Sequence, residues 1–171
     1  MAKKKIKKDS MSLIKKGISL VAAAVTFVFM FLEMLAVSTR GSLFGKEGDI
    51  ASEGVKYFDV LFGDEAIYES IRENLSLTTI ILWVVFVMAI LAVAFCVISF
   101  LVKKGAKFSK LGSGLLFVAM LLLFVVNFDK ASFSLGGLAS SETWISNITV
   151  LYFVSLVFSG AGFVSALSLK K

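Results

Sequence analysis

The longest apolar run of this chain is LTTIILWVVFVMAILAVAFCVISFLV, which extends from Leu77 to Val102. It contains no charged residue, and two lysines, Lys103 and Lys104, follow it directly. About 20 apolar residues are enough to cross the roughly 30 Å of hydrocarbon in a bilayer. Because a backbone in lipid must satisfy its own hydrogen bonds, a run of this length folds as an α-helix. The run therefore predicts a membrane-spanning helix that ends at a basic turn.

Three further apolar runs have a similar length, and charged residues border each of them. We predict an all-α integral membrane protein, a single-domain bundle of four transmembrane helices. The predicted spans are residues 17–37, 77–102, 111–128 and 145–169. The predicted segments outside the membrane are a basic N-terminus (1–16), a long acidic loop (38–76), a basic turn (103–110), a second loop (129–144) and a C-terminus (170–171).

The composition narrows the chemistry that this chain can perform. Hydrophobic residues make up 58% of it, against about 45–50% in soluble domains, and the mean hydropathy is +0.92. There is no His and no Pro, and Cys96 in the second run is the only cysteine. An intramolecular disulfide and a Cys/His zinc site are therefore excluded. We expect Cys96 to be a small packing residue, and we expect no cofactor.

The distribution of charge predicts the orientation in the membrane. The two ends of the chain and the 103–110 turn hold 13 of the 18 Lys and Arg residues and one of the 12 acids, Asp9. By the positive-inside rule, both termini then lie in the cytoplasm and the two loops outside. We expect a multi-pass protein of the plasma membrane. The net charge of +6 follows from this orientation, so we expect no nucleic-acid partner.

The first apolar run follows Lys15 and Lys16, a pattern that also begins secretory signal peptides. Its length exceeds the roughly 7–15 residues of a signal-peptide core, and no A-x-A cleavage site follows it. We expect a retained span.

The long loop has its own local patterns. Residues 55–62 are rich in β-branched and aromatic side chains and predict a short strand. Asp64 is a candidate N-cap, and Ile67, Ile71 and Leu75 recur every four residues, which predicts an amphipathic helix. The acids of the loop are typical of a solvated surface; Ca²⁺ binding is the alternative. The apolar and aromatic residues that we expect to contact a partner are Tyr57, Phe58, Phe62, Ile67, Tyr68 and Ile71.

Glu33 is the one acid inside a predicted span. On a helix it shares a face with Ser19, Ala22 and Thr26, a stripe that should face other helices. A carboxylate within a membrane is energetically costly, so Glu33 is a candidate functional residue. Together with Asn127 and Asp129 at the end of the third span, Glu33 would line a polar vestibule. The alternative is that Glu33 reaches water or pairs with Arg40, and that Asn127 and Asp129 mark the end of a helix.

The second and fourth spans carry stripes of small residues at helical spacing. Such stripes typically let helices pack closely in membranes, either within one chain or between subunits. The predicted packing seams consist of Ala89, Ala92, Cys96 and Ser99, and of Ser155, Ser159, Gly162 and Ala166.

The order of these parts is similar to that of claudin-type and other four-span junction proteins. The shared features are a long first loop, a short inner turn, a short second loop and cytoplasmic termini. The claudin signature of Gly-Leu-Trp followed by two cysteines is absent, because residues 38–76 contain neither Trp nor Cys. The resemblance therefore covers topology alone, which many unrelated proteins share.

Two classes of function follow. The first is a non-catalytic subunit or scaffold of a membrane complex, whose long loop contacts a membrane or extracytoplasmic protein or a second copy of the chain. The second is a small channel, holin-like pore or transporter that uses the vestibule of Glu33, Asn127 and Asp129. We expect no enzyme, because the sequence contains no paired catalytic constellation.

Overall fold

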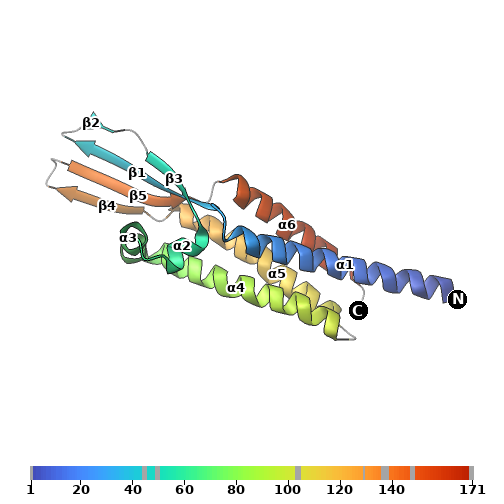
Figure 1. The fold of residues 1–171 in the computed structure, drawn as a ribbon. Helices are drawn as coiled ribbons and strands as arrows, with labels where there is room; N and C mark the ends of the chain where they lie inside the picture. The colour runs from blue at the N-terminus through green and yellow to red at the C-terminus, as the bar shows by residue number, and fades with distance from the viewer. Residues whose placement is uncertain are drawn as a thin grey trace. The chain divides into compact units, whose positions relative to one another are not determined.

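The computed structural model describes residues 2–43, 46–48, 51–102, 105–128, 130–135, 139–146 and 149–169. Within these residues, four helices are long and apolar enough to cross a membrane (Figure 1). The helices are α1 (Ala2–Phe29), α2 (Tyr57–Phe62), α3 (Ala66–Asn74), α4 (Ser76–Leu101), α5 (Ala106–Leu123), the 3₁₀ helix η1 (Phe124–Phe128) and α6 (Val150–Leu167). The strands are β1 (Leu35–Leu43), β2 (Lys46–Glu47), β3 (Ala51–Val55), β4 (Lys130–Leu135) and β5 (Ala139–Ser146).

The chain divides into two compact units. The helical unit comprises Met1–Val28, Val85–Leu121 and Val154–Lys171. The sheet unit comprises Phe29–Val84 and Leu122–Phe153. Each unit is therefore assembled from segments that are distant in the sequence.

Small residues allow the helices of the helical unit to approach one another closely. A Cβ atom added at Gly162 of α6 would lie 2.8 Å from the Cβ of Ala22 in α1. A Cβ atom at Gly112 of α5 would lie 2.7 Å from the carbonyl oxygen of Ala92 in α4. Real Cβ atoms do not approach so closely, so both crossings require glycine. This is the packing that small residues provide in membrane bundles.

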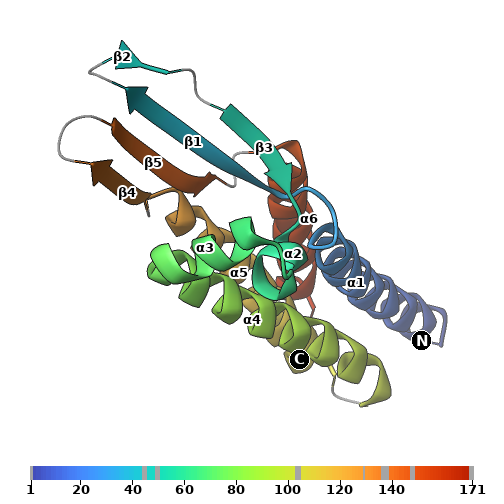
Figure 2. The same cartoon turned by 60° about the vertical axis from the view of Figure 1, so that its left-hand side comes forward.

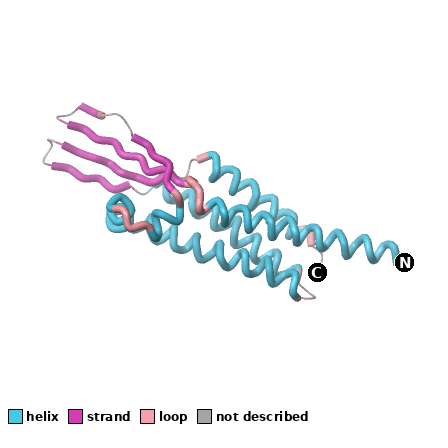
Figure 3. The backbone as a smooth tube through the Cα atoms, in the orientation of Figure 1, coloured by secondary structure: helices cyan, strands magenta, loops and turns pink. Residues whose placement is uncertain are grey.

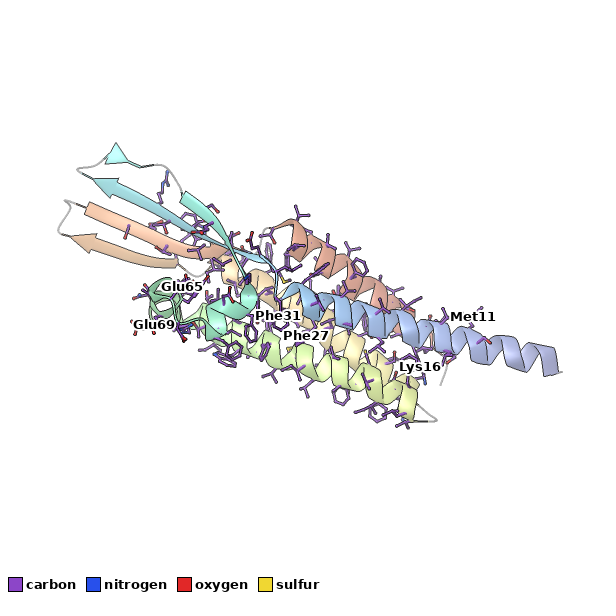
Figure 4. All side chains as sticks on the ribbon, viewed as in Figure 1. Met11, Lys16, Phe27, Phe31, Glu65 and Glu69 are labelled. Atoms are coloured by element: carbon purple, nitrogen blue, oxygen red, sulfur yellow. The ribbon has the colours of Figure 1, made fainter. Side chains whose placement is uncertain are left out.

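Two lysines of α1 bind the C-terminal ends of other helices in this unit. Lys16 Nζ donates to the carbonyl oxygen of Ser99 in α4 at 2.6 Å, and Lys15 Nζ donates to that of Ser168, just after α6, at 3.4 Å. The last carbonyls of a helix are unpaired and carry partial negative charge, so ammonium groups stabilise them. The N-terminal half of α1 and the C-terminal ends of α4 and α6 thus lie at one end of the helical unit (Figure 4).

The sheet unit contains a five-stranded antiparallel sheet with the order β2-β1-β5-β4, in which β3 also pairs with β1 (Figures 2 and 3). Its central pair is β1 with β5, in register from Ala36↔Ser146 to Leu43↔Ala139. On its other side β1 pairs with β3 from Leu35↔Val55 to Thr39↔Ala51. The first loop supplies β1, β2 and β3, and the second supplies β4 and β5. The two loops therefore form one structure.

The prediction of an all-α protein is wrong because the chain also forms this sheet. The error arises at the ends of two apolar runs. The predicted span 17–37 contains the end of α1 and the start of β1, where Leu35 and Val37 are buried in the sheet unit. The predicted span 145–169 likewise begins within β5, at buried Ile145. A continuous apolar run does not distinguish a buried strand from a helix. The helix α1 therefore ends at Phe29, before the end of its apolar run, and α6 begins at Val150, after the start of its run.

The predicted strand at 55–62 is also wrong, because residues 57–62 form the helix α2. Tyr57, Val60 and Leu61 lie three and four residues apart, and all three are buried. This helical spacing outweighs the β propensity of the individual residues. The amphipathic helix after it is confirmed as α3, although its N-cap position is Glu65 rather than Asp64 and no side chain caps it.

Candidate interaction surface

Three hydrogen bonds hold α2 in place within the sheet unit. The hydroxyl of Tyr57, whose side chain is fully buried, donates to the carbonyl oxygen of Leu82 in α4. Arg72 Nη1 of α3 donates to the carbonyl oxygen of Val60 at 3.0 Å. The amide of Phe58 donates to the carbonyl oxygen of Met30 at 3.1 Å. A buried tyrosine hydroxyl needs such a partner, so α2 is fixed to three separate segments.

An aromatic row crosses the surface of this anchored helix. Its rings come from three distant segments, and their centroids are 4.9 Å apart for Phe31 and Phe58, 4.4 Å for Phe58 and Phe62, and 5.1 Å for Phe62 and Trp83. Phe31, Phe62 and Trp83 are 42%, 41% and 41% exposed. Large aromatic side chains held in place by their neighbours are the usual anchors of protein interfaces. We call these four residues the aromatic row; Figure 4 labels Phe31.

An acidic stripe follows the row along α3. Glu65, Glu69 and Glu73 are exposed and recur every four residues, so they share one side of the helix (Figure 4). The buried face of α3 contains Ile71. The acidic stripe begins three residues after Phe62, the residue of the aromatic row that ends α2.

Tyr68 lies at the junction of α2 and α3. A Cβ atom at Gly63 would lie 2.6 Å from Cδ2 of Tyr68, so the glycine lets the ring pack against the chain there. Burial, and then the negative charges of Glu65, Asp59 and Glu53, raise the pKa of the Tyr68 phenol above its usual 10.0. An ion pair of 3.7 Å between Lys56 and Asp59 partly offsets this acidic field.

The residues predicted to contact a partner divide into two groups. Tyr57 and Ile71 are buried and support the surface from beneath. Phe58, Phe62 and Tyr68 reach the surface, while the side chain of Ile67 lies outside the described residues. The structure adds Phe31 and Trp83, which could not be placed here from the sequence because they belong to other segments. Their apolar and aromatic character was the only available signal.

The predicted polar vestibule is not assembled within the described residues. Glu33 follows the end of α1 and is exposed, with its carboxylate beside Gly54 of β3. It therefore does not continue the helix face of Ser19 and Thr26. Asn127 accepts a hydrogen bond from the hydroxyl of Ser146 at 3.1 Å, which ties η1 to the end of β5. Asp129 lies outside the described residues, so the vestibule stays a hypothesis.

The predicted packing seams lie inside the helical unit, where all of their residues are buried. These are Ala89, Ala92, Cys96 and Ser99 of α4, and Ser155, Ser159, Gly162 and Ala166 of α6. Cys96 Sγ is 3.8 Å from the carbonyl oxygen of Ser19, at the place where α1 and α4 meet.

Among the described residues, no group of three or more His, Cys, Asp or Glu side chains is arranged to hold a metal ion. The fold defines a class: a multi-pass helical membrane protein with an additional unit that contains an antiparallel sheet and two short helices. Comparisons of the chain with protein-family models, with curated proteins and with solved structures found no match.

Proposed function

We propose that this chain is a non-catalytic subunit or scaffold of a plasma-membrane complex, with both termini in the cytoplasm and the sheet unit outside. In this proposal the aromatic row and the acidic stripe together form the surface that binds a protein partner. The observation that carries it is the anchoring of α2. Three hydrogen bonds fix a six-residue helix whose outward rings are exposed, which is more support than a solvated loop needs.

The chemistry of the surface indicates the partner. The aromatic row favours an apolar or aromatic counterpart, because burying such rings supplies most of the binding energy at interfaces. The acidic stripe of Glu65, Glu69 and Glu73 favours Lys or Arg at the border of that counterpart and disfavours anionic lipid headgroups. We therefore expect a membrane or extracytoplasmic protein with a basic rim around an apolar patch. A second copy of this chain fits less well, since its own surface is acidic.

Photo-crosslinking in intact cells tests the proposal. A photoreactive phenylalanine analogue at Phe62 should crosslink to one protein in high yield. The same analogue at Phe128, which is 72% exposed and lies outside the aromatic row, should not crosslink to that protein. Crosslinks from Phe62 to lipid alone would contradict the proposal.

The affinity of the chain for the crosslinked protein then measures how much the aromatic row contributes to binding. We expect Phe62→Ala to weaken binding by about 30-fold, as for an interface hot spot of about 2 kcal/mol. Phe128→Ala should leave the affinity unchanged, and raised salt should weaken the wild-type complex because the acidic stripe is exposed to solvent. Equal losses for the two variants would show that the aromatic row is not the contact.

A further inference from the structure

Besides Ser109 Oγ of α5, two hydroxyl groups in the core of the helical unit have no hydrogen-bond partner among the described residues. They are Thr26 Oγ1 of α1 and Ser155 Oγ of α6, and both side chains are 0% exposed. Two other hydroxyls form hydrogen bonds between these helices. Ser19 Oγ donates to the carbonyl oxygen of Gly162 at 3.1 Å, and Ser165 Oγ donates to that of Lys15 at 3.3 Å.

The contacts between α1 and α6 set the register of the two helices. Lys15 meets Ser165, Ser19 meets Gly162, and Ala22 lies against Gly162, so residue numbers rise on α1 as they fall on α6. Four residues beyond Ala22, the chain reaches Thr26. The matching level on α6 falls between Ser155 and Ser159. The unsatisfied hydroxyls of Thr26 and Ser155 therefore lie at one level of the same seam.

Helix geometry also directs the two side chains toward each other. At 100° per residue, Ser155 projects within about 20° of Gly162, the residue that touches α1. Thr26 projects between Ser19 and Ala22, both of which contact α6. Each hydroxyl offers one donor and two acceptor positions. Leaving them unsatisfied in a buried place costs free energy, and buried polar groups in this situation commonly bind water.

We propose that one water molecule binds in the seam between α1 and α6, bridging Thr26 Oγ1 and Ser155 Oγ. The site is polar on both sides, as a buried water requires, since such waters typically make two to four hydrogen bonds. Ser159 Oγ differs from these two hydroxyls, because it already donates to the carbonyl oxygen of Leu156 at 2.9 Å. The water would fix the register of the two helices where neither a direct hydrogen bond nor a glycine contact does so.

The direction in which one substitution changes the melting temperature tests this inference. Thr26→Val keeps the shape of the side chain and removes the hydroxyl. If the hydroxyl binds the water, the variant should melt about 2 °C lower, as expected for an interhelical hydrogen bond in a membrane protein. If the hydroxyl is unsatisfied, its removal should leave the melting temperature of the full chain in detergent unchanged or raise it, and that result overturns the proposal.

A double-mutant cycle and a matched control complete the stability test. Ser155→Ala should also lower the melting temperature, and Thr26→Val combined with Ser155→Ala should cost less than the sum of the two. Ser159→Ala makes the same change one turn along α6, at a hydroxyl that its own helix satisfies. It should show no coupling to Thr26→Val. Additive effects of Thr26→Val and Ser155→Ala would contradict the proposal.

Solid-state NMR in lipid bilayers distinguishes a bridging water from a direct bond. With ¹³C-labelled threonine, magnetisation should pass from water to the Thr26 side chain, and Ser155→Ala should reduce this transfer. Thr26→Val identifies the signal by removing it. Coupling in the stability cycle without any transfer from water would mean that Thr26 and Ser155 bond directly, and the water site would be wrong.

Discussion

At the scale of single residues, Gly162 shows how closely α1 and α6 pack. A Cβ atom there would lie 2.8 Å from the Cβ of Ala22, whose position the α1 backbone fixes. We therefore expect Gly162→Ala to destabilise the chain by about 1–3 kcal/mol, the usual cost of overpacking. Thermal unfolding in detergent measures this loss of stability.

Gly160, two residues away on the same helix, is the matched control. Its added Cβ would meet only the ring of Phe117 at 3.5 Å, an ordinary contact. Gly160→Ala should be neutral or slightly stabilising, because alanine is the better helix former by about 1 kcal/mol. Similar effects at Gly160 and Gly162 would contradict the close crossing of α1 and α6.

The pKa of Tyr68 depends on the negative charges around α2 and α3. Its pKa is raised by burial and by Glu65, Asp59 and Glu53, so the folded state favours the neutral phenol. The stability that this preference contributes is present below pH 10.0 and is lost as the pH rises through the raised pKa. Ultraviolet titration, with Tyr68→Phe as the reference, should place this phenol above 10.0, and Glu65→Gln should lower its pKa. An unchanged pKa in Glu65→Gln would contradict the contribution of Glu65 to this shift.

At the scale of elements, the anchoring of α2 predicts a local effect. Tyr57→Phe removes the hydroxyl that donates to Leu82, so the amides of residues 57–62 should exchange hydrogen faster. The free energy of unfolding should fall by about 0.5–1.5 kcal/mol. Mass spectrometry after hydrogen exchange measures the first effect, and chemical denaturation measures the second.

Tyr68→Phe makes the same chemical change on the neighbouring helix, at a side chain that is only half-buried. It should leave the exchange of residues 57–62 unchanged. If both variants loosen α2 equally, the bond from Tyr57 to Leu82 is not what holds the helix.

The elements also show what local sequence can predict. Long apolar runs, their basic borders and the small-residue stripes predicted the long helices and their buried faces, because each of these signals is local. Ile71 and Leu75 likewise predicted α3 from their spacing. The pairing of β1 with β5 could not be predicted, since Ala36 and Ser146 are distant in the chain and their strands continue the apolar runs of neighbouring helices. The aromatic row was missed for the same reason, because Phe31, Phe62 and Trp83 come together only through the fold.

At the scale of the whole molecule, the proposed function requires each part to lie on a particular side of the membrane. Lys15 and Lys16 bind the ends of α6 and α4, so the basic part of α1 and both helix ends share one end of the helical unit. Basic residues concentrated at one end favour the cytoplasm. The aromatic row can bind an extracytoplasmic partner only if the sheet unit lies outside.

Cysteine labelling in intact cells tests this arrangement most directly. Replacing Cys96 by Ala removes the single native cysteine, after which one new cysteine is placed either at Ser52 of β3 or at Lys107 of α5, both of which are exposed. A membrane-impermeant maleimide should label Ser52→Cys in intact cells and should label Lys107→Cys only after the cells are permeabilised. Labelling of Lys107→Cys in intact cells, with Ser52→Cys protected until permeabilisation, would contradict the account.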